Sequence, residues 1–140
     1  MEMLASGLPK LIGDEEELAR FLTSSGHFNT VSVKAPAFIP SPKSKETSVS
    51  RHGREPQKRL WRIGEAAVVA TERKLYGAAI LAAAEIRATN LEIISDEPPD
   101  RHAAIRAWPW IENDPEEQKA QQKERAILLA SAAGPPFLKA

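Results

Sequence analysis

The chain has 140 residues, of which 42% are apolar and 27% charged, and its 19 basic and 19 acidic residues leave no net charge. This length and composition predict one globular domain with its own hydrophobic core. The absence of cysteine excludes a disulfide framework, a thiolate metal site and a cysteine nucleophile. Because the chain is neutral, any attraction to nucleic acid or to an anionic membrane must be local.

Residues 1–13 are expected to form a flexible N-terminal arm, followed by a single α+β domain over residues 14–140. Glu2 stands where a secretory signal would carry a basic residue, and Gly7 and Pro9 interrupt the apolar residues. The longest weakly polar run, residues 75–84, is far shorter than the ~20 residues that cross a bilayer. We therefore expect a cytoplasmic protein that does not contact the membrane.

The first element predicted after the arm is a helix over residues 14–24. Asp14 suits the N-cap position, and Glu17 follows three residues later as in a capping box. The apolar residues fall at helical spacing on one face: Leu18, Phe21 and Leu22.

Two short strands are expected next. Residues 31–35 alternate apolar and polar, and the prolines that follow favour an edge position or an early end. The sequence "TSVSR", residues 47–51, is β-like, with Val49 as its main apolar anchor.

A helix over residues 56–71 follows, because Pro56 suits a first helical turn and the apolar residues then recur on one side. The Ala-rich segment at 75–84 fits either a helix or a strand. We favour a strand at 77–83, a short helical turn at 84–89 and a strand at 91–95, which ends at "SDEPPD".

The last part of the chain predicts a strand and a long helix. Residues 102–108 alternate as in a half-buried strand that Pro109 stops. Asp114 and Pro115 begin a helix that ends near Gly134, with a polar first half and an apolar second half. The sum is an α+β fold: one small, mainly antiparallel sheet of about five short strands, with three helices.

The segment from Arg51 to Arg62 contains five Lys or Arg residues and one His against a single acid. If a strand ends near Arg51 and a helix begins near Pro56, the turn between them lies at a helix N-terminus, where free N–H groups favour an anion. The predicted anion-binding residues are Arg51, His52, Gly53 and Arg54. The alternative is a solvated turn and a polar helix face, and no phosphate-binding loop motif is present.

His102 opens a predicted strand after a turn, which makes it the candidate for proton transfer in a catalytic site. The three histidines lack the spacing of a metal-binding helix, so no metal site and no cofactor are predicted. Ser48 and Ser50 lack the motif that surrounds a hydrolase nucleophile.

The sequence "WPW" places Trp108 and Trp110 close together near a strand end. An indole beside Arg106 is typical of contact sites between proteins, so these three residues are predicted to form an interaction surface. Stacking on a nucleic-acid base is the weaker alternative, because the chain has few aromatic residues.

Three segments, "TSVSR", "LWRIGEAAV" and "HAAIRAWP", followed by a helix with "EEQK", resemble a family of small uncharacterised bacterial proteins with "SVFR", "IWxIG" and "HAxIxGWP" segments. The resemblance spans about residues 17–133. This chain has Ser50 in place of an aromatic residue and Ala107 in place of glycine. The resemblance implies a bacterial origin and one intact domain, and it implies no activity.

Three functional hypotheses follow from these patterns. The first is an accessory or interaction domain without catalytic activity, which contacts a protein partner or a second copy of itself, because segregated charges on a neutral molecule orient partners. The second is a small enzyme or sensor for a nucleotide or another phosphate-bearing small molecule. The third and weakest is nucleic-acid binding through residues 56–71.

Overall fold

The structure, a computed structural model, describes residues 2–52, 56–69 and 71–139. Its strands are β1 (Glu17–Leu22), β2 (Thr47–Arg51), β3 (Gly77–Ala82), β4 (Glu92–Ser95), β5 (His102–Arg106) and β6 (Phe137–Leu138). Its α-helices are α1 (Gln57–Val69), α2 (Ala83–Arg87) and α3 (Pro115–Ala133), and two short 3-10 helices are η1 (Ser25–His27) and η2 (Ala35–Ala37). Within these described ranges the six strands form one sheet in the order β4-β5-β2-β1-β3-β6, and every pairing is antiparallel.

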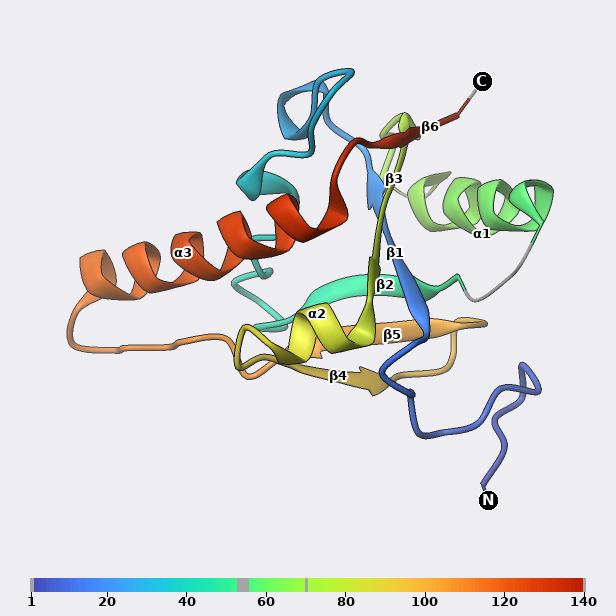
Figure 1. Cartoon of the computed structure of the whole chain (residues 1–140), viewed down its shortest axis with the longest axis horizontal. Coiled ribbons are helices and arrows are strands. Elements are labelled where there is room, and N and C mark those ends of the chain that lie inside the picture. Colours follow the sequence, from blue (N-terminus) through green and yellow to red (C-terminus); the bar gives the residue numbers. More distant parts are fainter. Residues whose placement is uncertain (1, 53–55, 70, 140) are drawn as a thin grey trace.

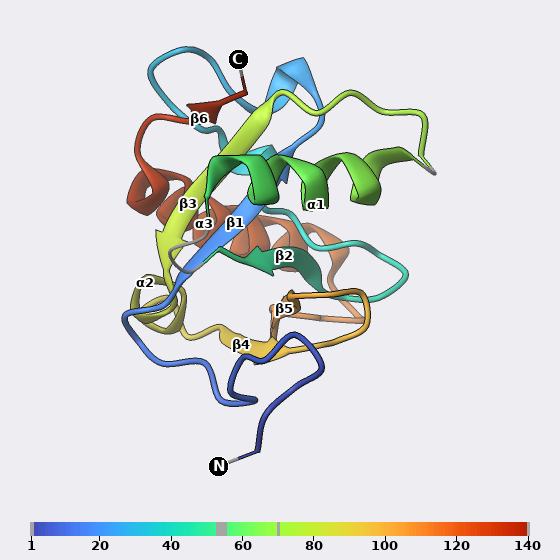
Figure 2. The same ribbon diagram turned by 90° about the vertical axis from the view of Figure 1, so that its right-hand side faces the viewer.

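Helices cover both faces of this sheet (Figure 1). Figure 2 shows α1 in front of the sheet, whereas α3 lies behind it. The larger hydrophobic core lies on the α3 side, with Leu18, Leu22, Ile105 and Leu129 among its buried members. The smaller core lies under α1, where Leu60 packs against strand residues such as Ala19 and Ala78.

The predicted fold class, an α+β domain with a small antiparallel sheet and three helices, is confirmed. The predicted strands at 47–51 and 91–95 appear as β2 and β4, and the ambiguous segment at 77–83 forms strand β3. The helical turn after β3 is α2. In α3, Asp114 is the N-cap and its side chain accepts a hydrogen bond from Glu117 N, so the local capping signal alone located this helix start.

The helix predicted at 14–24 is wrong, because this segment forms β1. It is a central strand that pairs with β3 over six residues and with β2 over two. The apparent helical spacing arises because the strand is buried on both faces: Leu18 and Leu22 enter the larger core, whereas Phe21 packs under α1. Asp14 caps no helix and instead accepts a hydrogen bond from Arg87 Nη1 at 2.5 Å.

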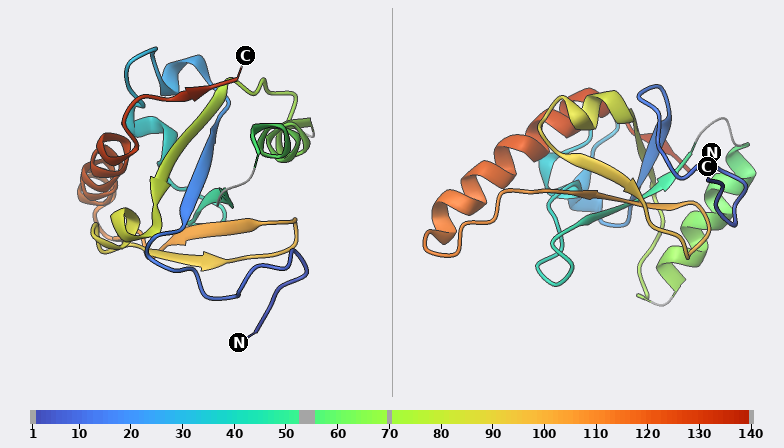
Figure 3. Two further views of the ribbon diagram at one scale, coloured as in Figure 1. Left: turned by 45° about the vertical axis from the view of Figure 1, so that its right-hand side comes forward. Right: turned by 90° about the horizontal axis from the view of Figure 1, so that it is seen from below.

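One other segment differs from expectation. The strand predicted at 31–35 is reduced to one isolated bridge, Phe28 with Val33, followed by η2. Of the arm predicted at residues 1–13, the described part, residues 2–13, lies along the sheet near β4 (Figure 3). Ile12 is buried there, and backbone oxygens of this arm accept hydrogen bonds from the body of the domain.

In the part of the chain that the structure describes, no helix is long and apolar enough to cross a membrane. The second half of α3 packs on the domain through Ala126, Leu129 and Ala130, and its first half is mostly exposed. Figure 3 shows this first half extending beyond the edge of the sheet.

Candidate functional site

The candidate site begins where two neighbouring strands separate. β1 pairs with β2 only at Leu18 with Arg51 and at Ala19 with Ser50. Beyond this point Arg20 occupies the space between the strands, where its Nε donates to Ala37 O at 2.7 Å and its Nη1 donates to Ser48 O at 2.9 Å. No described residue accepts a hydrogen bond from Nη2. The Arg20 guanidinium therefore takes the place of the missing strand pairing. Its Nη2 still has N–H donors that a ligand could accept from.

A pocket of about 380 Å³ opens at this place, between the sheet and α1. This volume lies within the range of small-molecule sites. We call it the α1 pocket. Its apolar wall includes residues of β1 and α1, namely Phe21, Ile63, Ala66, Ala67 and Val68. Its polar and charged lining residues include Arg20, Ser50, Arg73, Asp100 and His102.

One part of the α1 pocket is strongly basic. Burial, and to a lesser degree the charge of Arg73, lower the pKa of Arg20 to about 10. The pKa of His27 is lowered from 6.5 by burial and then by the charges of Arg20 and Arg73. Among the described residues, neither Arg20 nor Arg73 has an acidic partner. Arg20 and Arg73 both line the pocket and carry like charges, so a bound anion would stabilise this pair.

Another part of the pocket is formed by β2 and β5. Ser50 lies directly opposite His102 in the register of these strands, so their side chains lie on the same face of the sheet. His102 Nδ1 lies 3.0 Å from Asp96 O and 3.3 Å from Asp96 Oδ2. Ser50 is 3% exposed, and its buried Oγ has no hydrogen-bond partner in the described part of the chain.

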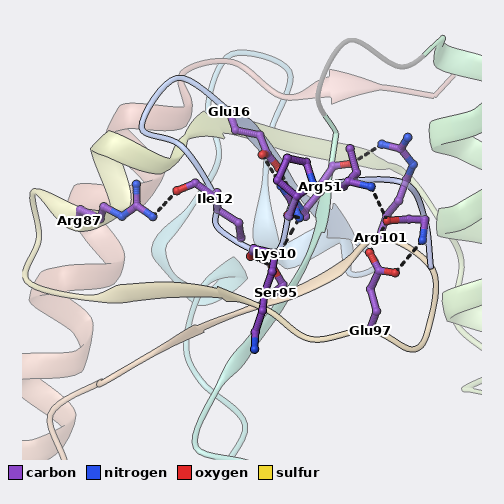
Figure 4. Close-up of polar contacts among 11 residues, drawn as sticks. Lys10, Ile12, Glu16, Arg51, Arg87, Ser95, Glu97 and Arg101 are labelled. Atoms are coloured by element: carbon purple, nitrogen blue, oxygen red, sulfur yellow. Dashed lines mark hydrogen bonds and ion pairs between the residues drawn. The ribbon is translucent and has the colours of Figure 1, made fainter. Parts of the chain in front are cut away.

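Arg51 lies on the opposite face of the sheet from His102, because side chains alternate along β2 and Ser50 shares the face of His102. It is 1% exposed. Its Nε and Nη2 bind the carboxylate of Glu16, and its Nη1 donates to Pro9 O at 2.5 Å and to Ser95 Oγ at 3.4 Å (Figure 4). Every guanidinium nitrogen of Arg51 therefore has a partner within the protein, which argues against the predicted role of Arg51 in binding an external anion.

Apart from Arg51, one residue of the predicted anion site, His52, lies in the described part of the chain. His52 donates its backbone N–H to Glu17 O at 3.0 Å, and it is not among the residues that line the α1 pocket. Gly53 and Arg54 lie outside the described residues. Of the described residues predicted for ligand chemistry, which are Arg51, His52 and His102, only His102 lines the pocket.

The predicted interaction surface is also divided. Trp108 is only 6% exposed and its Nε1 donates to Ile105 O at 3.2 Å, so its indole belongs to the core and leaves little surface for a partner. Trp110 is half-buried, with Lys45 Nζ 5.1 Å from its ring centroid. Arg106 is exposed and its Nε lies 3.0 Å from Glu92 Oε2.

The sequence does contain a signal for Arg20, which stands alone among apolar residues in "LARFL". The helical interpretation concealed this signal, because it considered only the apolar face formed by Leu18, Phe21 and Leu22. No local pattern marks Arg73 or Ser50, which reach the pocket from different elements and through strand pairing.

In the ranges that the structure describes, no group of three or more His, Cys, Asp or Glu side chains could hold a metal ion. No protein family, curated protein or solved structure matches the chain.

Proposed function

We propose that this domain is a small accessory or sensor domain that binds an acidic small molecule with an apolar body in the α1 pocket. The observation that carries the proposal is the pair Arg20 and Arg73, which line the pocket without an acidic partner among the described residues. A carboxylate or a phosphate would supply the missing negative charge through charge-assisted hydrogen bonds. The bacterial cytoplasm expected from the sequence is part of this proposal.

The apolar wall determines the rest of the ligand. Phe21, Ile63 and Val68 present hydrocarbon surface beside the two guanidinium groups. An apolar body is therefore expected to bury against α1 while the acid group pairs with Arg20 and Arg73. This places the phosphate-binding hypothesis at a different site from the one predicted at Arg51.

The proposal is tested by titration calorimetry with three matched probes: phenylpropanoate, phenyl phosphate and phenylpropanamide. We expect the two acids to bind and the neutral amide to bind much more weakly. The acid that binds more tightly shows whether the pocket prefers a carboxylate or a phosphate. Arg73→Gln removes one charged donor and should lower the affinity for both acids roughly tenfold.

Arg62→Gln is the matched control, because Arg62 is exposed on α1 and is not among the pocket residues. It should leave the affinity of both acids unchanged. Equal binding of the amide and the acids, or equal effects of the two arginine variants, would contradict an anion site at the α1 pocket.

A further inference from the structure

The α1 pocket is proposed to recognise one acidic group of its ligand. The tautomer of His102 indicates a second group that the pocket recognises. Both groups near Nδ1, the carbonyl oxygen and the carboxylate of Asp96, are hydrogen-bond acceptors. The neutral ring must therefore carry its proton on Nδ1, which leaves the lone pair of Nε2 as an acceptor. The polar contacts described for His102 use Nδ1 and leave Nε2 available to a ligand.

Ser50 adds a second requirement in the same place. Its Oγ has no partner among the described residues although the side chain is almost fully buried. An unsatisfied buried hydroxyl is costly. The Ser50 hydroxyl can donate as well as accept, so a group that satisfies its O–H donor and the acceptor of His102 must accept from Ser50 Oγ and donate to His102 Nε2. A hydroxyl does both, whereas an ammonium only donates and a carbonyl only accepts.

The pairing of Asp100 also bears on the choice between a hydroxyl and an ammonium. Asp100, which also lines the pocket, lies 4.0 Å from Arg59 Nη2, so its negative charge already has a cationic neighbour. This pairing reduces the attraction that an ammonium group would find beside His102.

The strand order sets the spacing between the two recognised groups. Arg20 lies on β1 and His102 on β5, with β2 between them. Two strand spacings amount to about 10 Å, and the Arg20 side chain, which reaches Ser48 O on β2, brings the two recognised groups closer together than that. A rigid apolar body of one aromatic ring with a short side chain matches this separation.

We infer that the α1 pocket recognises a hydroxylated aromatic or aliphatic acid, whose anionic group pairs with Arg20 and Arg73 and whose hydroxyl binds between His102 and Ser50. This inference rests on the proposed function, because it requires that the pocket bind an acid. It adds His102 and Ser50 as residues that determine specificity.

The experiment compares para-hydroxyphenylpropanoate with phenylpropanoate by titration calorimetry. In the wild-type protein the hydroxyl should increase the affinity about 3- to 10-fold, the range expected for one added hydrogen bond. In His102→Phe this ratio should fall to about one while both acids still bind. Arg73→Gln should lower the affinity for both acids by the same factor, so the ratio of the two affinities should not change.

A second variant and a second measurement keep the inference testable if His102→Phe does not fold. Ser50→Ala should reduce the ratio through loss of one partner, and nitrogen NMR should show the neutral ring of His102 protonated on Nδ1. A wild-type ratio of one, or a proton on Nε2, overturns the inference even if the acids bind. If neither acid binds, the proposed function fails as well.

Discussion

At the scale of single residues, Arg51 shows how burial changes the meaning of a charge. The sequence places it in a basic segment, which suggests an external anion. The structure instead encloses it between Glu16, the N-terminal arm and Ser95. A buried guanidinium must have its hydrogen bonds satisfied, and here the protein itself supplies every acceptor. Arg51 therefore holds the arm against the sheet.

Arg51→Ala should accordingly reduce the free energy of unfolding by about 2–4 kcal/mol, because it leaves Glu16 without its partner and empties a buried site. Urea denaturation measures this loss. Arg62→Ala, at an exposed position on α1, should change stability by less than about 0.5 kcal/mol. Equal stabilities of the two variants would contradict a structural role for Arg51.

At the scale of elements, β1 and β6 show what strand pairing contributes. β1 is a strand because both of its edges are paired, not because of local propensity. β6 has only two residues and pairs with β3 at Gly77 and Ala78. Its position depends on the absence of a side chain at Gly77, where an added Cβ would lie 2.4 Å from Phe137 O.

Gly77→Ala should therefore release β6 from the edge of the sheet, since backbone atoms there have no room to move aside. We expect a loss of about 1–3 kcal/mol in stability. Amide hydrogen exchange should become faster at Lys139, whose N–H bonds to Tyr76 O.

Gly13→Ala is the control for this change, because an added Cβ at Gly13 meets nothing within 4 Å. It should leave exchange at Lys139 unaltered. Retained protection of Lys139 in Gly77→Ala would show that β6 tolerates the extra carbon.

At the scale of the whole molecule, zero net charge conceals a local excess of positive charge around Arg20, Arg73 and His27. In the folded state the pKa of His27 lies below the 6.5 of the unfolded chain. Between these two pKa values the unfolded chain binds more protons. The contribution of His27 to stability is thus complete above pH 6.5 and is lost as the pH falls through the folded pKa.

His27→Gln should flatten the decline in stability between about pH 8 and pH 5, as measured by urea denaturation across that range. An NMR titration of His27 provides the companion measurement. Its pKa should rise in Arg73→Gln, which removes a nearby positive charge, and it should rise when an acid occupies the α1 pocket. If the pKa of His27 changes in neither case, the charge of Arg73 does not act on His27.

The protein-contact hypothesis also belongs to this scale. It no longer includes Trp108, but the first half of α3 is exposed, and Ile127 and Leu128 are each 50% exposed. We retain contact with a protein partner or a second copy as a second proposal. Sedimentation velocity tests self-association: a dimer that Leu128→Glu dissociates would support this contact, and a monomer at all concentrations would exclude the homo-oligomer.

Local signals in the sequence were sufficient for several parts of this protein. The capping residues Asp114 and Pro115 and the terminating Gly134 define α3, because a helix end is determined by its own few residues. Glycine, proline and asparagine residues similarly indicated the boundaries of the segments that form β3, α2 and β4. Composition and element order were enough to predict the α+β class.

Only the tertiary structure decided the identity of β1, the internal role of Arg51 and the location of the pocket. Each depends on partners distant in the chain: β3 and β2 for β1, Glu16 for Arg51, and α1 with β5 for the residues around Arg20. Strand pairing and burial on both faces are properties of the assembled sheet. Helical spacing in a short apolar segment cannot anticipate them, because a strand buried on two sides presents apolar residues at the same positions.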